Sequence, residues 1–94
     1  MGDKIEVARR TTGGHAYYFD CPGCGEPHAF TDAWEWNGSA ERPTFSPSLL
    51  VNAERPERRC HLFVRNGRVE FLPDCHHTLA GQTIGMTDVF VEGQ

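Results

Sequence analysis

The sequence has no excess of basic residues and no long apolar run. Its 94 residues include 9 Lys and Arg against 13 Asp and Glu, which gives a net charge of −4. A nucleic-acid-binding domain normally presents a basic surface that displaces counterions from phosphates, so this charge balance argues against nucleic acid as a partner. No segment approaches the roughly 20 apolar residues of a transmembrane helix, and we expect no membrane partner either.

The chain also lacks a sustained apolar helical face, internal repeats and low-complexity tracts. Its 10 Gly and 6 Pro are spread along the whole length, which favours short strands joined by turns. A domain of this size buries only a thin core and gains much from a metal ion or a cross-link. We therefore predict a mainly β fold, a small single domain of short antiparallel strands and hairpins over residues 1–94.

The predicted strands are bounded by turns rich in glycine, proline or asparagine. The clearest signal is a hairpin in which Cys60–Arg65 and Arg68–Cys75 flank Asn66-Gly67, a pair typical of two-residue turns. Thr78–Gly85 is expected to form a single helical turn with a glycine at its exit. Further strands are predicted at Ile5–Ala8, His15–Asp20, His28–Trp36, Thr44–Val51 and Asp88–Val91.

The four cysteines need an explanation other than disulfides. The first residues, Met1–Glu6, contain no apolar signal segment, so we expect the chain in the cytoplasm, where stable disulfides are uncommon. Cys21 and Cys24 form a C-x2-C motif in a Pro/Gly-rich turn, which lets two thiolates converge on one ion. Zinc takes four nitrogen or sulfur ligands in a tetrahedron, so a second pair has to come from elsewhere in the chain.

The second pair of ligands is expected from the hairpin. Its two-residue turn sets a register that pairs Cys60 with Pro73 and puts Cys60 and Cys75 on one face, because side chains alternate along a strand. His28 and His77 are alternatives for the fourth ligand. Buried free cysteines without a metal, or a catalytic zinc with three ligands and a water, are the other interpretations. The sequence thus predicts a domain stabilised by a structural Zn²⁺ on Cys21, Cys24, Cys60 and Cys75.

The opposite face of the same hairpin carries a histidine and an aspartate. The register places Asp74 diagonally across from His61, about 7–8 Å away at the backbone. A carboxylate that accepts a hydrogen bond from one imidazole nitrogen fixes the tautomer and raises the basicity of the other nitrogen. Ser48 or Ser46, in a proline-kinked strand just upstream of the hairpin, would complete a Ser-His-Asp site. The simpler interpretation is a polar contact on a sheet surface, with both serines bonded to turn backbone.

Two tryptophans, Trp34 and Trp36, lie at strand spacing on one face of a predicted strand. In a small domain such side chains more often pack on the core than form a ligand platform. We therefore expect both to be packing residues.

Several consecutive motifs resemble one known family in order and spacing. The family consists of small proteins of phages and of bacterial operons for ubiquitin-like conjugation. Some members are mislabelled as ammonia monooxygenase, a name that nothing in this chain supports. The resemblance covers roughly residues 17–85. Its motifs are Cys21–Gly25, Trp34–Gly38, Pro43–Leu50, Cys60–Val64 and Phe71–Gly81.

The resemblance implies a hydrolase. Members in conjugation operons are taken to be serine peptidases that trim or release ubiquitin-like proteins. Matching positions imply Ser48 as the nucleophile, His61 as the general base and Asp74 as its orienting partner. Position 75 is implied to be serine in some relatives, which favours His28 or His77 as the fourth zinc ligand. The expected partner is a protein or peptide substrate, such as a ubiquitin-like protein, in the cytosol of a bacterium or a phage-infected host.

Three function hypotheses result. The first is a serine peptidase with a Ser-His-Asp site on a structural-zinc scaffold, which cleaves after the C-terminus of a ubiquitin-like protein. The second is a non-catalytic zinc-binding interaction module of phage origin, in which Trp34, Trp36 and Phe45 form an exposed patch. The third is zinc-dependent hydrolysis, which a chelator would stop before the protein unfolds.

Overall fold

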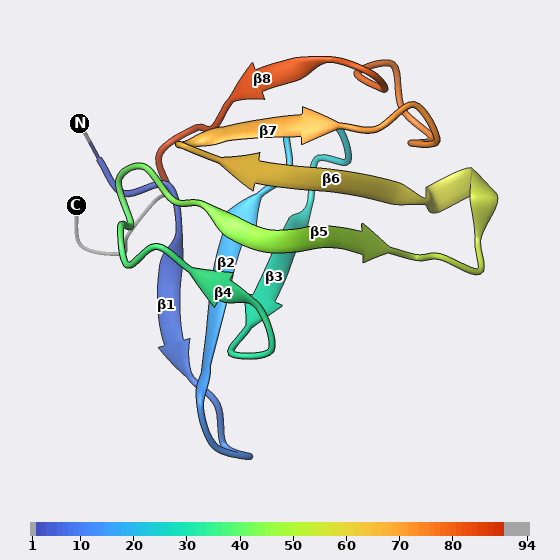
Figure 1. The fold of residues 1–94 in the computed structure, drawn as a ribbon. Coiled ribbons are helices and arrows are strands. Elements are labelled where there is room, and N and C mark those ends of the chain that lie inside the picture. Colours follow the sequence, from blue (N-terminus) through green and yellow to red (C-terminus); the bar gives the residue numbers. More distant parts are fainter. Residues whose placement is uncertain (1, 90–94) are drawn as a thin grey trace.

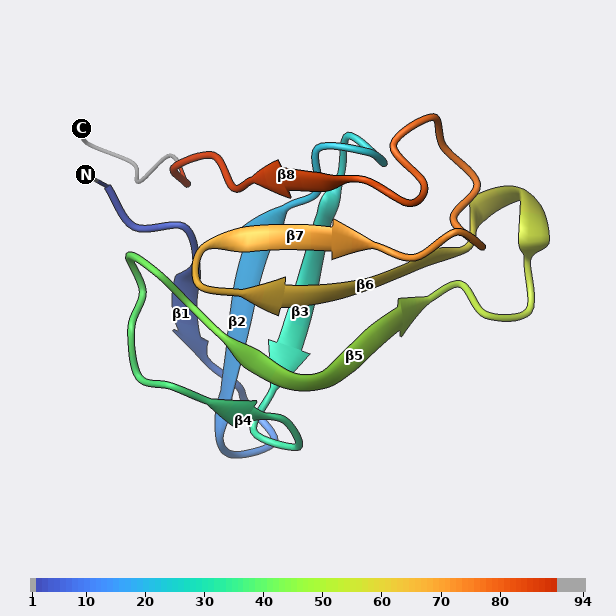
Figure 2. The same cartoon turned by 45° about the horizontal axis from the view of Figure 1, so that its top comes forward.

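Residues 2–89 are described by a computed structural model, in which the strands form two antiparallel sheets. The three-stranded sheet has the order β1-β2-β3 and the five-stranded sheet the order β4-β5-β6-β7-β8. Strands of the second sheet cross those of the first (Figures 1 and 2). The strands are β1 (Glu6–Arg9), β2 (His15–Asp20), β3 (Pro27–Thr31), β4 (Glu35–Trp36), β5 (Phe45–Val51), β6 (Cys60–Arg65), β7 (Arg68–Phe71) and β8 (Thr83–Gly85), with a 3-10 turn, η1 (Pro56–Arg58), before β6.

The predicted mainly β fold is confirmed, and no α-helix occurs in residues 2–89. Nothing in this range is a helix long and apolar enough to cross a membrane. The predicted helical turn at Thr78–Gly85 is wrong in its second half, which is β8. Two isolated turn bonds, Ala80 N–H to His77 O and Gln82 N–H to Leu79 O, do not propagate, because Gly81 between them has a positive φ of 79°.

Two other predicted strands differ from the structure. The segment His28–Trp36 is divided between β3 and β4, which belong to different sheets. A turn separates them, in which the Trp34 N–H donates to Thr31 O at 3.1 Å. In the predicted strand Asp88–Val91, residues 88 and 89 are not in a strand, and residues 90 and 91 lie outside the described residues.

Aromatic side chains from both sheets form the core. Phe30 of β3 stacks on Phe45 of β5 with ring centroids 4.1 Å apart and planes inclined by 3°. Phe19 of β2 also stacks on Phe30, with ring centroids 5.8 Å apart. All three rings are almost completely buried. Burial of such a side chain contributes about 1.5–3 kcal/mol, so these rings are a main source of the adhesion between the sheets.

The two tryptophans pack against this core, as the sequence predicts. Trp34 meets Phe30 edge-on at 5.4 Å, and Trp36 stacks on Phe45 at 6.1 Å. Phe45 itself is only 1 % exposed. Phe45 therefore cannot contribute to the exposed patch that the interaction-module hypothesis requires, and both tryptophans are partly buried against the core.

The β6–β7 hairpin has the predicted register near its turn. Arg65 pairs with Arg68, and two further pairs lead to Leu62 opposite Phe71. Asn66 and Gly67 have φ values of 52° and 77°, the left-handed conformation that a two-residue hairpin turn of this kind requires. The predicted pair of Cys60 with Pro73 is not formed, because β7 ends at Phe71 and the chain turns away over residues 72–75.

Strand β5 is irregular where it carries the candidate nucleophile. Phe45 pairs with Val64 and Leu49 pairs with Leu62, so the four steps along β5 match only two along β6. This β-bulge lies around Ser46-Pro47, a cis peptide bond. Bulges of this type bend a strand and change the direction of its side chains. Here the bulge redirects the residues that precede Leu49.

Candidate functional site

The structure brings Ser48, His61 and Asp74 together on the outer face of the five-stranded sheet. Ser48 Oγ lies 3.2 Å from His61 Nε2. On the other side of the imidazole, Nδ1 lies 3.3 Å from Asp74 Oδ2. This is the order of contacts in a Ser-His-Asp site, in which Nδ1–H donates to the carboxylate and Nε2 accepts the serine proton.

Each of these side chains is positioned by a different structural feature. His61 is the second residue of β6 and is paired with Leu50 of β5, so both point to the same face. Ser48 lies within the β5 bulge, and its backbone oxygen accepts a hydrogen bond from the Trp34 indole at 3.2 Å. Asp74 lies in the turn that follows β7. Ser46, the other serine considered from the sequence, is exposed and is paired with Glu35 of β4 rather than with β6.

The site is open to solvent. The His61 side chain is 27 % exposed and that of Asp74 is 46 % exposed. An ion pair with this exposure contributes about 0–1 kcal/mol to stability. The contact therefore adds little to folding stability. Both side chains are exposed enough for a substrate to reach them.

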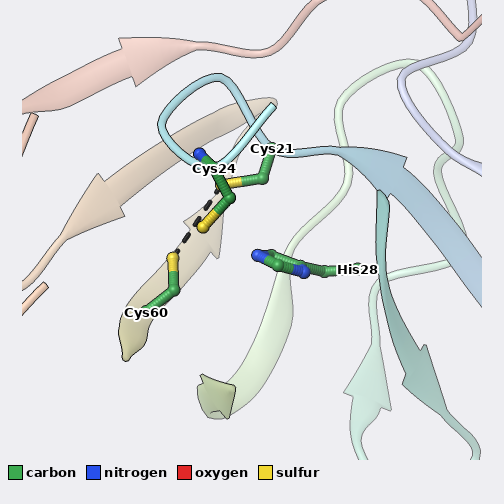
Figure 3. A group of neighbouring side chains, drawn as sticks. All are labelled: Cys21, Cys24, His28 and Cys60. Carbon is green, nitrogen blue, oxygen red and sulfur yellow. Dashed lines mark hydrogen bonds between the residues drawn. The ribbon is translucent and has the colours of Figure 1, made fainter. Parts of the chain in front are cut away.

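A cluster of metal donors lies on the inner side of β6, where Cys60 is located. Cys21, Cys24, His28 and Cys60 each offer one ligand atom, and these atoms all lie within 4.8 Å of one another. Figure 3 shows how the knuckle after β2, the start of β3 and the start of β6 direct their side chains toward one region. Cys21 Sγ and Cys60 Sγ are 3.8 Å apart. Two thiolates on a tetrahedral zinc, each about 2.3 Å from the ion, are separated by about 3.8 Å.

His28 supports this interpretation of the cluster. The residue is 6 % exposed, and its Nε2 is buried without a hydrogen-bond partner. Its Nδ1 lies 3.1 Å from Pro27 O, so Nδ1 carries the proton and Nε2 has a free lone pair. That is the usual tautomer of a metal-binding histidine. A buried acceptor without a partner costs about 1–3 kcal/mol, which a metal bond at Nε2 would offset. The donor set therefore fits a metal ion.

The thiols of the cluster perturb one another strongly. The hydrogen bond from the Cys60 thiol lowers the pKa of Cys21 to about 3, against the opposing effect of burial. Burial, followed by repulsion from the Cys21 thiolate, raises the pKa of Cys24 to about 11. The pKa of Cys60 is raised for the reciprocal reason, because its proton is shared with Cys21. Without a metal, the three thiols thus hold one negative charge at neutral pH.

Cys75 lies near Cys60 but in a second group. Cys60, Cys75 and His77 also have donor atoms within 4.8 Å of one another. The sulfur of Cys75 contacts the backbone of His61, with 3.1 Å to the carbonyl oxygen and 3.3 Å to the nitrogen. His77 Nε2 is 3.6 Å from Cys60 Sγ. Of the two reserve histidines named from the sequence, His28 joins Cys21 and Cys24, and His77 joins Cys75.

Sequence reasoning missed the role of two residues. His76 Nε2 lies 3.4 Å from Cys24 Sγ, at the exposed edge of the cluster. A Cβ at Gly23 would collide with the His77 ring, so a larger residue at this position of the knuckle would require the His77 side chain to move. The run Cys75-His76-His77 directly after the hairpin was the available signal for His76, whereas the contact of Gly23 depends on long-range packing.

One family model matches this chain. The family is described as "Bacterial ubiquitination-like system serine protease (BubE)", and the match covers residues 2–72. The matched part contains Ser48, His61 and the cluster Cys21, Cys24, His28 and Cys60, and it ends just before Asp74. No curated protein and no solved structure matches the chain in the corresponding comparisons. Since the match spans well over half of the residues, this chain belongs to the family of serine proteases of bacterial ubiquitination-like systems.

Proposed function

We propose that this chain is a serine peptidase that cleaves after the C-terminus of a ubiquitin-like protein, with Ser48 as nucleophile, His61 as general base and Asp74 as orienting carboxylate. The observation that carries the proposal is the 3.2 Å contact between Ser48 Oγ and His61 Nε2 on a face open to solvent. The family description supports a protein substrate in a ubiquitination-like system.

The first half of the reaction forms an acyl-enzyme. Ser48 Oγ attacks the carbonyl carbon of the scissile amide while its proton passes to His61 Nε2. Asp74 accepts the hydrogen bond from Nδ1–H, which selects the tautomer with its lone pair at Nε2 and stabilises the imidazolium afterwards. The tetrahedral intermediate then loses the amine, which takes the proton from Nε2 as the C–N bond breaks.

The second half regenerates the enzyme. A water molecule gives a proton to His61 Nε2 and adds to the acyl carbon. The ester bond to Ser48 Oγ then breaks, and the proton from Nε2 returns to the serine oxygen. The products are the carboxylate of the trimmed protein and the amine of the released segment, so that one water is consumed for each peptide bond.

We also propose that the inner cluster holds a structural zinc ion, with Cys21, Cys24, Cys60 and His28 as ligands. Bound there, zinc would cross-link the knuckle to the hairpin and leave no ligand position for water, since four protein donors complete a tetrahedron. His28 is favoured over Cys75 because its Nε2 is buried without another partner. Thiolate ligands of this kind persist in a reducing compartment, so the cytoplasm is the proposed place of action.

Replacement of Ser48 tests the peptidase proposal. Ser48→Ala is expected to reduce cleavage of a C-terminally extended ubiquitin-like protein by at least about 10⁴-fold, measured by intact mass. It should also abolish labelling by a serine-reactive phosphonate, while the zinc content and the melting temperature stay unchanged.

Ser46→Ala is the matched control, because Ser46 lies on the same strand but is exposed and paired with Glu35. It should retain both activities. Full activity in Ser48→Ala, or loss of activity in Ser46→Ala alone, would remove Ser48 from the mechanism.

A further inference from the structure

The backbone around His61 departs from regular hairpin pairing. In an antiparallel hairpin with a two-residue turn, every second pair exchanges two backbone hydrogen bonds. Counted from Arg65 and Arg68, His61 and Leu72 form such a pair. Leu72 N–H does donate to His61 O, at 2.9 Å. Leu72 O, however, accepts the N–H of Cys75 at 3.2 Å and so closes the turn 72–75.

The side chain of Cys75 supplies the missing partner. The His61 N–H donates to Cys75 Sγ at 3.3 Å, in place of the usual carbonyl of the opposite strand. The thiol in turn donates to His61 O at 3.1 Å. One half-buried side chain is thus bonded to both backbone groups of the candidate general base.

These bonds fix the segment that carries the candidate carboxylate. The turn 72–75 is attached to His61 at both ends, through Leu72 N–H at one end and Cys75 Sγ at the other. Asp74 lies between these two attachments and reaches the imidazole of the same residue. Because its side chain is 46 % exposed, little other packing holds it in place.

We infer that Cys75 is a positioning residue, whose protonated thiol holds the turn 72–75 on the backbone of His61 and thereby sets the contact between His61 and Asp74. The inference rests on the proposed function for its effect on catalysis. It differs from a ligand role for Cys75, because a metal-bound thiolate has no proton to donate to His61 O.

The test compares Cys75→Ser with Cys75→Ala. Serine keeps one donor and one acceptor, whereas alanine removes both. With a peptide diphenyl phosphonate as the probe, we expect Cys75→Ala to lower the limiting rate of serine labelling roughly 10- to 100-fold, because misplacement of reacting groups by about 1 Å has effects of this size. The half-saturating probe concentration should not change, and Cys75→Ser should recover most of the rate. Both variants should keep one zinc per chain.

A double-mutant cycle separates positioning from general damage. If Cys75 acts through Asp74, Cys75→Ala should cost little further rate in an Asp74→Asn background. Additive effects of the two substitutions would overturn the inference. Loss of zinc from both Cys75 variants would also overturn it and would make Cys75 a ligand.

Backbone hydrogen exchange keeps the inference testable without enzyme activity. Cys75→Ala should accelerate exchange of the His61 amide, and Cys75→Ser should not. Unchanged exchange in Cys75→Ala would contradict the hydrogen-bonding role. If exchange changes as expected but the wild-type protein is never labelled at Ser48, the proposed function fails while the role of Cys75 in holding the turn stands.

Discussion

The inner and outer faces of β6 carry different chemistry, although their residues alternate along one strand. Cys60 is completely buried and belongs to the metal cluster, whereas its neighbour His61 is partly exposed and contacts Ser48. On the inner face, sulfur ligands for a metal are buried away from water. On the outer face, the imidazole is open to a substrate. Since the two residues share a peptide bond, a metal that fixes Cys60 also fixes the backbone of His61. A metal can therefore support catalysis here without contact with the substrate.

Removal of the proposed zinc ion should have the largest effect, because it would affect both faces together. Zinc binding contributes about 10–16 kcal/mol in small zinc-folded domains, so a strong chelator is expected to unfold the zinc-loaded protein. Circular dichroism and phosphonate labelling should be lost in parallel. The Ser48→Ala variant is the control and should unfold at the same chelator concentration. Loss of labelling in a protein that keeps its melting temperature would instead indicate a catalytic metal.

Substitutions at two consecutive residues should separate the faces. His61→Gln is expected to lower kcat by at least about 10⁴-fold, because it removes the proposed general base. The zinc content should stay at its wild-type value, and the melting temperature should change by only a few degrees. Cys60→Ser should lose zinc, stability and activity together. Metal analysis and thermal unfolding of both variants test whether zinc binding and catalysis depend on different faces of β6. Loss of zinc from His61→Gln would contradict this.

The affinity of the inner face for zinc should depend steeply on pH. The pKa of Cys24 is raised to about 11 by burial and by Cys21, and that of Cys60 is raised as well, so both thiols are protonated at neutral pH. Cys21, with its pKa lowered to about 3, is already a thiolate. Zinc therefore has to displace the protons of at least these two thiols, and its apparent affinity should increase by at least about 100-fold per pH unit. Chelator competition at pH 6.5 and 7.5 measures this slope, and a slope near zero would contradict the protonation states.

The smallest effect is expected at Asp32, directly after β3, whose hydrogen bonds are with residues of β2 and not with β6. Hydrogen bonds from Tyr17 OH at 2.7 Å and from the His15 N–H lower the pKa of Asp32. A lowered pKa stabilises the fold above the unfolded-state pKa, and this contribution is lost as pH falls through the folded-state value. Asp32→Asn should therefore be slightly less stable than wild type at pH 7 and equally stable at pH 2, with labelling and zinc content unaffected. A destabilisation that persists unchanged at pH 2 would assign the effect to packing.

The hairpin register was predictable because it depends on neighbours in the chain. Asn66-Gly67 selects a two-residue turn, and the alternation of side chains then assigns Cys60 and His61 to opposite faces. The C-x2-C knuckle is equally local. These two features supply three of the four donors of the cluster, as well as the candidate general base.

The choice of the fourth donor was not predictable from local pattern. His28, Cys75 and His77 were all open as candidates, and their spacing along the chain does not rank them. His28 meets Cys21 and Cys60 because β3 brings it to the knuckle across the first sheet, where its Nε2 is buried without a partner. Burial of that nitrogen depends on the contact between the two sheets.

The sequence by itself determined the class of fold, the hairpin register near its turn and the separation of sulfur from imidazole on the two faces of β6. Only the tertiary structure decided that Ser48 meets His61 and that His28 completes the inner cluster. It alone decided the bonding of the Cys75 thiol to the His61 backbone as well. The physical reason is that alternation and turn preferences act between neighbouring residues. A bulge in β5, the departure of the chain at Leu72 and the crossing of two sheets, by contrast, are settled by packing between distant segments.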